Sequence, residues 1–419
     1  MTDAAALIAQ EDRFGAHNYD PLPVVLTRGQ GTFVWDVEGR KYLDCLSAYS
    51  AVNQGHCHPR LVAALVEQAN RLALPSRAFR HDRMGPLLEK LCALSGMEMA
   101  LLMNSGAEAF ETAVKAARKW GVTVRGGLSA AEAPEIIVCD GNFHGRTVTA
   151  ISASSEPAYR DGFGPFTPGF VRVPFGDLEA LRGAMTGRTV AFLTEPIQGE
   201  AGVRVPPDGY LSAAKRLCAE RRVLFMLDEI QTGLGRTGAR FAFEHEPDAR
   251  PDVLLLGKAL SGGMYPVSAV LASREVLGVF GPGEHGSTFG GNPLGAAVAS
   301  AALDVLLDEH LVGRARALGE RLLGRLRAVD SPLIEEVRGR GLLVGVVLRE
   351  GLGARSSARP YCEALMRRGL LCKETHDRVL RIAPPLVVTE EQVDFIASEV
   401  EAVLRAFEEA PTDAPEQGG

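Results

Sequence analysis

The sequence lacks the features of several classes of protein. No apolar run in its 419 residues approaches the ~20 residues that a membrane-spanning helix needs. The formal net charge of −7 argues against a general nucleic-acid binder. The first twenty residues contain neither the apolar core of a signal peptide nor the arginine-rich helix of a transit peptide. These absences predict a globular, cytoplasmic protein without a membrane or nucleic-acid partner.

Cysteine is also scarce, and its spacing is not that of a disulfide framework. The seven cysteines are an odd number, are scattered through the chain and form no CxxC motif. This usage is typical of free thiols in a reducing cytoplasm. The run His56-Cys57-His58 offers metal-binding atoms, but adjacent residues cannot easily converge on one ion. We therefore expect no metal site.

Lysine is also scarce in this sequence. Only seven of the 45 basic residues are lysines, so the chain normally uses arginine where any cation would serve. Lys258 is one of the few, and it follows a run of leucines and precedes Ala-Leu-Ser-Gly-Gly. A lysine beside a buried apolar strand can lose its proton and become a nucleophile, which an arginine cannot do. The sequence therefore marks Lys258 as a candidate reactive amine.

Two short apolar runs, residues 223–227 and 253–256, frame the region around this lysine. Their length and their Val/Leu content predict buried strands of a parallel sheet. Asp228 closes the first run and Lys258 lies just after the second. Because ligands of open α/β sheets lie at the carboxyl ends of strands, both side chains should face one crevice. An aspartate there can keep a pyridine nitrogen protonated, although the pair could also be a plain salt bridge at the strand ends.

The elements around these two runs alternate between strands and helices, as in a doubly wound α/β sheet. A hairpin is predicted at 32–44, and further strands at 100–103, 135–139, 190–194 and 267–272. Helices are predicted at 59–72, 108–120 and 294–307. The strand–Ser–Gly–helix arrangement near residue 105 could bind an anion at the helix amino terminus, or could be only a cap.

From about residue 310 the pattern changes to an α+β module. Its predicted elements are residues 311–329, 334–338, 342–348, 360–368, 370–373, 379–382 and 390–406. We therefore divide the chain into an N-terminal arm and hairpin (1–50) that packs with the small domain, a large domain (51–309), a small domain (310–408) and a disordered tail (409–419). The glycine-rich loop 281–293 is not a dinucleotide fingerprint, because no strand leads into it. It should be a flexible cap able to reach a neighbouring subunit.

Several long motifs resemble those of the class III aminotransferases, and within them the ornithine aminotransferases. They run from about residue 14 to about residue 388 and include GAHNY, WDVEGRKY, SAYSAVNQGHCHP, EPIQGEAGV, DEIQTGLGRTG, LLGKALSGG, YPVSAVL, GEHGSTFGGNPLG and RIAPPLV. The resemblance implies the fold type I of pyridoxal-phosphate enzymes: a large, doubly wound, mostly parallel sheet domain and a smaller α+β domain. It also implies the cofactor pyridoxal 5′-phosphate and a homodimer with shared active sites.

The resemblance assigns cofactor roles to residues that match the family motifs. Lys258 matches the lysine that binds the cofactor covalently and moves the substrate proton, and Asp228 matches the carboxylate on the pyridine nitrogen. The other matches are Ser105, Gly106 and Ala107 at the phosphate, Phe143 and His144 at the ring, Gln231 at the phenolic oxygen, and Thr288 reaching the phosphate from the other subunit.

Five further matches lie on the substrate side. Tyr19 and Tyr49 match tyrosines that line the ornithine pocket, and Arg146 matches the arginine that binds the distal carboxylate. An Arg381 side chain without a carboxylate partner near the cofactor would hold the α-carboxylate of the substrate and direct transfer to the α-amine. If Glu200 neutralises Arg381, the site favours ornithine's terminal amine, and the pair must open for 2-oxoglutarate. Without the resemblance, a salt bridge between domains would be an equal explanation of this pair.

Two residues depart from the ornithine aminotransferase pattern. Phe110 stands on the phosphate-side helix where the family has a small residue. His144 stands where the family has Trp, and FHGRT (residues 143–147) is the usual sequence of this motif in the acetylornithine branch. The departure at residues 143–147 bears on the substrate assignment, whereas Phe110 should be tolerated if it points to the core. The cofactor motif DEIQTG shows no departure.

The resemblance predicts transfer of the δ-amine of L-ornithine to 2-oxoglutarate by a ping-pong mechanism, as in arginine and proline metabolism. The products would be glutamate and glutamate 5-semialdehyde, which cyclises to pyrroline-5-carboxylate. N-acetylornithine, lysine or 4-aminobutyrate are alternative amino donors. A pyridoxal-phosphate racemase would share Lys258 and Asp228 but need no keto acid, and a cofactor-binding regulator would need no catalysis.

Overall fold

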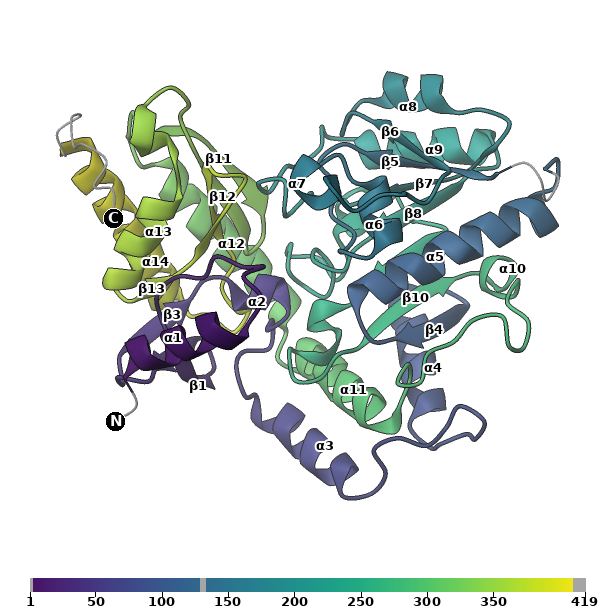
Figure 1. The fold of residues 1–419 in the computed structure, drawn as a ribbon, viewed down its shortest axis with the longest axis horizontal. Helices are drawn as coiled ribbons and strands as arrows, with labels where there is room; N and C mark the ends of the chain where they lie inside the picture. Colours follow the sequence, from purple (N-terminus) through teal and green to yellow (C-terminus); the bar gives the residue numbers. More distant parts are fainter. Residues whose placement is uncertain (1–2, 129–132, 410–419) are drawn as a thin grey trace.

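A seven-stranded sheet forms the centre of the chain in the computed structural model, which describes residues 3–128 and 133–409 (Figure 1). Its strand order is β4-β10-β9-β8-β7-β5-β6. The five strands from β9 to β6 are parallel, and β10 is antiparallel to both of its neighbours. The strands are β4 (Met99–Met103), β5 (Glu135–Cys139), β6 (Phe170–Val173), β7 (Thr189–Thr194), β8 (Leu224–Asp228), β9 (Val253–Leu256) and β10 (Ser268–Ala272). The predicted doubly wound, mostly parallel sheet is confirmed.

Helices cover both faces of this sheet, which explains why its strands are apolar throughout. Along β8, Leu224 and Met226 pack with α5, whereas Phe225 and Leu227 belong to the core on the opposite face. The first face is covered by α5 (Gly106–Trp120) and α6 (Val148–Ala153). The opposite face is covered by α4 (Met84–Ser95), α8 (Leu178–Ala184), α9 (Tyr210–Glu220) and α11 (Pro293–Asp308).

A smaller antiparallel sheet, in the order β11-β12-β15-β14, lies in the C-terminal part of the chain. Its strands are β11 (Ile334–Arg340), β12 (Leu343–Leu348), β14 (Lys373–Thr375) and β15 (Val379–Ile382). Helices α12 (Leu311–Arg327), α13 (Arg359–Arg367) and α14 (Glu390–Glu409) accompany it. The small α+β module expected from about residue 310 is therefore present.

The N-terminal hairpin pairs with the C-terminal part of the chain in a third sheet. Its order is β1 (Leu26–Gln30), β2 (Phe33–Asp36), β3 (Lys41–Asp44) and β13 (Leu370–Leu371), with β13 parallel to β3. The predicted strand 370–373 is in fact two strands, because β13 joins this sheet and β14 joins the small one. The domain boundaries remain predictions, and the predicted tail 409–419 lies, apart from Glu409, outside the described residues.

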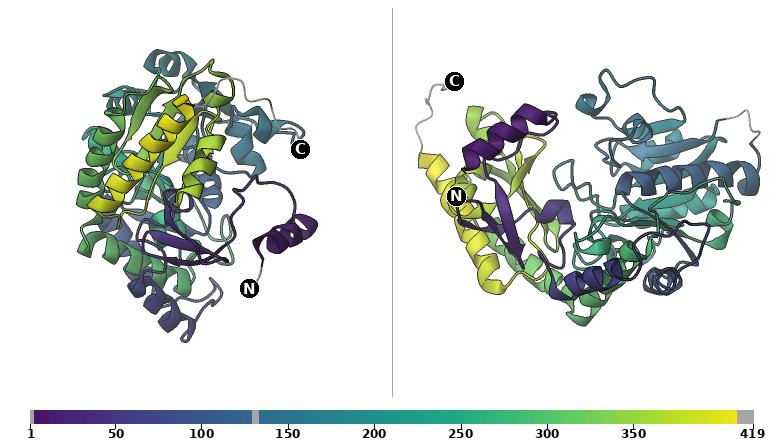
Figure 2. Two further views of the ribbon diagram at one scale, coloured as in Figure 1. Left: turned by 90° about the vertical axis from the view of Figure 1, so that its left-hand side faces the viewer. Right: turned by 60° about the horizontal axis from the view of Figure 1, so that its bottom comes forward.

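The remaining helices are short or lie at the margin of the molecule. They are α1 (Ala4–Phe14), α2 (Ser47–Ser50), α3 (Pro59–Ala69), α7 (Pro157–Arg160) and α10 (Arg274–Leu277). Short π or 3-10 segments are Gly121–Arg125, Ala242–His245, Lys258–Ser261 and Gly353–Ser356. In Figure 2, α1 stands out from the rest of the chain. Within the described residues, every helix is too short or too polar to cross a bilayer.

Candidate active site

A cavity of about 180 Å³ opens at the carboxyl ends of β7, β8 and β9. Eight of the predicted site residues line it: Gly106, Ala107, Phe143, His144, Glu200, Asp228, Gln231 and Lys258. Ser105 lines an adjoining cavity of about 270 Å³ together with Gly106 and Lys258. The expectation that Asp228 and Lys258 face one crevice is therefore confirmed.

A larger cleft, of about 580 Å³, lies elsewhere on the same sheet. Its lining includes Glu98, Leu224 and Asp252, which precede or begin strands β4, β8 and β9. It therefore lies at the amino ends of the parallel strands, whereas ligands of open α/β sheets bind at the carboxyl ends. The smaller cavity is the better candidate for the active site.

Lys258 begins the short 3-10 turn that follows β9 and has a left-handed backbone, with φ of 44°. A non-glycine residue held in this region stores strain, which is common at functional sites. Desolvation lowers the pKa of its ammonium group, and the nearby carboxylates of Glu200 and Asp228 only partly oppose this shift. Lys258 thus reaches the neutral, nucleophilic form more readily than an exposed lysine.

Asp228 ends β8 and is fixed by two hydrogen bonds. Its Oδ1 accepts from the N–H of Ile230 at 3.1 Å, and its Oδ2 lies 2.7 Å from Nδ1 of His144. An ionised carboxylate can only accept, so Nδ1 of His144 carries the proton of this bond. The imidazole also stacks on Phe110, with 5.2 Å between the ring centroids and 6° between the planes. The two departures from the family pattern, Phe110 and His144, therefore touch each other.

The turn from β4 to α5 has the features of an anion-binding site. Ser105 caps α5: its Oγ accepts from the N–H of Glu108, and the Glu108 carboxylate accepts from the N–H of Ser105 and of Asn104. Within the described residues, the N–H groups of Gly106 and Ala107 have no acceptor. Free N–H groups and the helix dipole together favour a phosphate at this position.

The unpartnered polar atoms of the cavity fit pyridoxal phosphate. Among the described residues, the buried Oε1 of Gln231 and Nε2 of His144 lack a hydrogen-bond partner. With the free N–H groups of the turn, they give the pocket places for a phosphate and for polar groups of a ring. The carboxylate of Asp228 suits a protonated pyridine nitrogen, and Lys258 suits the aldehyde carbon.

Glu200 and Arg381 form an ion pair between the cavity and the small sheet. Nη1 of Arg381 donates to Oε1 of Glu200 at 2.5 Å, and Nε2 of Gln231 donates to the same oxygen at 3.0 Å. The guanidinium lies 4.7 Å above the ring of Tyr49. Burial by itself would raise the pKa of Glu200, but Arg381 and Lys258 outweigh it and the pKa is lowered. Glu200 is therefore ionised at neutral pH and neutralises Arg381.

Arg146 lies against two aromatic rings, those of Tyr159 and Phe143. Its Cζ is 3.7 Å from the ring centroid of Tyr159 and 5.5 Å from that of Phe143. Those two rings meet edge to face at 5.9 Å. Sequence reasoning missed Tyr159, because it lies in a stretch without a strand, a glycine motif or a charge pattern.

Glu195 is a second residue that sequence reasoning did not assign to the site. It is buried in the cavity wall, and its Oε2 accepts from the N–H of Phe143 at 3.1 Å. Burial, followed by the charge of Asp228, raises its pKa well above the usual value. The available signal was positional, since Glu195 directly follows β7 as Asp228 ends β8.

Five predicted site residues line neither the candidate active-site cavity nor the adjoining one: Tyr19, Tyr49, Arg146, Thr288 and Arg381. The side chain of Tyr19 is 78% exposed. Thr288 is also exposed, and the preceding Ser287 accepts a hydrogen bond from Asn104 at 2.8 Å. The predicted role of Thr288 at the phosphate of a neighbouring subunit remains a prediction.

Comparisons with known proteins agree with this architecture. The model of the family "Aminotransferase class-III" matches residues 14–404. The ornithine aminotransferase of Bordetella pertussis is 59% identical over 394 residues, 94% of each chain. A structure of the Toxoplasma gondii ornithine aminotransferase with partial occupancy of PLP has a TM-score of 0.94 at 44% identity, over 97% of this chain and 95% of that one.

An acetylornithine aminotransferase is also structurally similar. The crystal structure of the Elizabethkingia anophelis enzyme has a TM-score of 0.87 at 49% identity, over 97% of this chain and all of the other. The family model covers nearly the whole chain, and relatives far above 30% identity match almost end to end. The chain belongs to the class-III aminotransferases.

Proposed function

We propose that this protein transfers the δ-amino group of L-ornithine to 2-oxoglutarate with pyridoxal phosphate as cofactor. The products are glutamate and glutamate 5-semialdehyde. The observation that carries the proposal is the Glu200–Arg381 ion pair, whose Glu200 lines the same cavity as Asp228 and Lys258. The identity to ornithine aminotransferases over nearly the full length supports it.

The cofactor, when bound, supplies an electron sink for negative charge at the carbon that bears the amine. Asp228, oriented by His144, would keep the pyridine nitrogen protonated and so maintain that sink. The N–H groups of Gly106 and Ala107 would bind the phosphate. Gln231 and Phe143, which line the same cavity, would hold the ring.

Lys258 moves the proton of the substrate. Desolvation lowers the pKa of its amine, which therefore reaches the neutral form more readily than that of an exposed lysine and would accept the proton from the substrate carbon next to nitrogen. Part of the cavity wall, including Glu195, Asp228 and Gln231, is buried, which limits the access of bulk water to that proton transfer.

Glu200 decides which amine of the substrate reacts. While Glu200 neutralises Arg381, no unpaired cation near the reacting carbon attracts a carboxylate. The carboxylate of ornithine, which is far from the reacting δ-amine, binds Arg146 instead. For 2-oxoglutarate, Glu200 must release Arg381, which then binds the α-carboxylate through two parallel N–H donors. The same pocket thereby serves an ω-amine in one half-reaction and an α-keto acid in the other.

A single half-reaction tests the proposal. Purified holoenzyme is mixed with L-ornithine, without a keto acid, and the visible absorbance of the cofactor is followed. We expect rapid loss of this absorbance and formation of pyrroline-5-carboxylate, trapped with 2-aminobenzaldehyde. The variant Lys258→Ala should retain cofactor and lose turnover. An ornithine-dependent turnover by this variant would contradict the proposal.

N-acetylornithine is the second candidate donor, because residues 143–147 and the Elizabethkingia anophelis enzyme both point to that branch. A faster half-reaction with N-acetylornithine than with ornithine would keep the fold and the cofactor site and change the substrate. Reaction only with lysine or 4-aminobutyrate would do the same. Loss of optical rotation without any keto acid would favour a racemase.

We further propose a cytoplasmic homodimer with shared active sites. The exposed apolar side chains of Leu72, Leu74, Phe79 and Phe289 support a subunit interface. The seven cysteines are all free, which supports a reducing compartment. Light scattering after size exclusion should give twice the chain mass of 44.7 kDa, and a monomeric, active enzyme would contradict shared sites.

A further inference from the structure

The segment that carries Tyr19 is held by very little apolar burial. Helix α1 contains no buried residue, and residues 15–21 are all exposed. Burial raises the pKa of Tyr49, and Tyr19 is a smaller contributor in the same direction, after Arg381 and Glu200. The role of Tyr19 at the amino donor is taken from the proposed function. Leu22, directly after this segment, packs against the apolar core, whereas residues 15–21 themselves are held by polar contacts.

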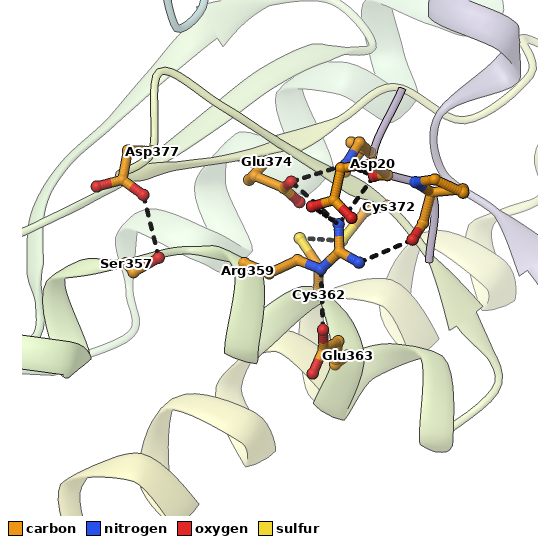
Figure 3. Close-up of polar contacts among 10 residues, drawn as sticks. Asp20, Ser357, Arg359, Cys362, Glu363, Cys372, Glu374 and Asp377 are labelled. Carbon is orange, nitrogen blue, oxygen red and sulfur yellow. Dashed lines mark hydrogen bonds and ion pairs between the residues drawn. The ribbon is translucent and has the colours of Figure 1, made fainter. Parts of the chain in front are cut away.

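Arg359, at the start of α13, provides most of these contacts (Figure 3). Its Nη2 donates to the carbonyl of Pro21 at 2.8 Å, and its Nη1 to the carbonyl and a carboxylate oxygen of Asp20 at 3.1 and 3.2 Å. Its Nε donates to Glu363 one turn further along α13, at 2.9 Å. Arg359 therefore binds the two residues that follow Tyr19 and is itself oriented by its own helix.

Two residues of β14 complete this arrangement, which we name the arm clamp (Arg359, Lys373 and Glu374). Nζ of Lys373 donates to the carbonyl of Asp20 at 2.9 Å and to Oε1 of Glu374 at 2.7 Å. The three clamp side chains are 22%, 22% and 17% exposed. The contacts among these three side chains are therefore screened less by water and salt than ordinary surface pairs, whereas the Asp20 carboxylate is 87% exposed.

The strand that carries two clamp residues is also bonded to the Glu200–Arg381 pair. Lys373 lies opposite Arg381 in the ladder between β14 and β15. The hydroxyl of Thr375, at the end of β14, donates to the backbone carbonyl of Glu200. One short strand thus connects the segment beside Tyr19 to the residues that select the reacting amine.

We propose that Arg359 is a positioning residue for the amino donor: it fixes residues 20 and 21 so that Tyr19 closes the donor side of the pocket. The inference rests on the proposed function, because it assigns Tyr19 to the binding of ornithine. Arg359 touches neither substrate nor cofactor in this scheme, and its effect passes through the backbone of the arm. The keto acid, which binds Arg381, depends on it much less.

The test is whether Arg359→Ala changes KM for ornithine and leaves kcat and KM for 2-oxoglutarate nearly unchanged. We expect KM for ornithine to rise roughly five-fold, as for the loss of partly exposed charged hydrogen bonds, with kcat and KM for 2-oxoglutarate within about two-fold of wild type. Proteolysis between residues 15 and 24 should become faster, a readout that does not depend on the substrate. Equal KM values and equal proteolysis would overturn the proposal.

Arg321→Ala is the matched control, because Arg321 also binds a carboxylate across two helices, at Asp394, but lies away from the arm. This control should leave both KM values unchanged. In Tyr19→Ala, adding Arg359→Ala should raise KM for ornithine little further, because both changes remove the same contact. Fully additive effects would overturn the proposal. If wild type does not react with ornithine, the proposed function fails separately, and the same comparison is made with the donor it accepts.

Discussion

In the proposed function, the carboxylate of Glu200 sets the selectivity of the pocket. Its oxygen Oε1 accepts hydrogen bonds from both Arg381 and Gln231, so the guanidinium is not buried without a counter-charge. Removing the negative charge leaves a cation free for any α-carboxylate. In the proposed function, the pair would therefore disfavour α-amino donors and favour ω-amino donors.

The variant Glu200→Gln tests this reasoning. The freed Arg381 should bind the α-carboxylate of glutamate as a donor, so the ratio of kcat/KM for ornithine to that for glutamate should fall by about 10- to 100-fold, the worth of one charged hydrogen bond. The measurement is steady-state kinetics with both donors. Glu200→Asp, which keeps the charge, is the control, and a ratio unchanged in Glu200→Gln would contradict the role.

Phe110 and His144 act as a pair. Phe110 is fully buried on α5, and its ring stacks on the imidazole that binds Asp228. Relative to the family pattern, Phe110 is larger than the small residue usual at that position, and the ring of His144 is smaller than the usual Trp. The two departures are one packing solution, and they leave the contact to Asp228 intact.

Phe110→Ala should therefore lower the free energy of unfolding by about 3–5 kcal/mol, as for other buried Phe→Ala changes. It should also weaken cofactor retention, because the imidazole loses the ring that orients it. Denaturant unfolding and cofactor release on dialysis measure the two effects. Adding His144→Trp should recover part of the stability by filling the space; a double variant no more stable than Phe110→Ala would contradict the pairing.

At the scale of elements, the sequence predicted the strands that build the site. β8 and β9 are covered on both faces, so their apolar residues form short uninterrupted runs, and the polar residues Asp228 and Lys258 follow directly. Sheet topology then places both at one edge without further information. The same logic would have found Glu195 after β7.

Other elements were missed for different reasons. α9 buries Tyr210, Leu211, Ala214, Leu217 and Cys218, an apolar stripe at helical spacing that the sequence does contain. β6 is only four residues long and has one buried residue, so its alternation is too brief to read. The division of residues 370–375 between β13 and β14 depends on pairing with strands far away in the sequence.

At the scale of the whole molecule, ionisable groups with full burial join distant parts of the chain. Arg236 donates to the carbonyls of Leu342 and Pro384 and to the side chain of Asn53. Burial lowers its pKa to about 9. These bonds connect the region before α3, the turn before β12 and the segment after β15. Removal of the guanidinium would leave three carbonyl acceptors without a donor.

Glu229 gives the molecule a defined pH dependence of stability. Its carboxylate accepts from the N–H groups of Ala242 and Phe243 and from Thr232, but burial raises its pKa from 4.5 to about 7. At pH values between these two pKa values, the folded state therefore keeps a proton that the unfolded state has lost. The contribution of Glu229 to stability is therefore fully present below pH 4.5 and is lost as the pH rises toward 7.

Comparison with Glu229→Gln isolates this contribution from that of other groups. His245, whose pKa burial lowers, acts in the opposite direction near pH 6, but it does so in both proteins. The free energy of unfolding of the variant, relative to wild type, should rise by about 2 kcal/mol between pH 5 and pH 7. Chemical unfolding of both holoenzymes across this range measures it. The amide leaves one backbone N–H without an acceptor, so the variant is less stable throughout, and only the slope is diagnostic. Parallel curves would show that Glu229 titrates alike in both states.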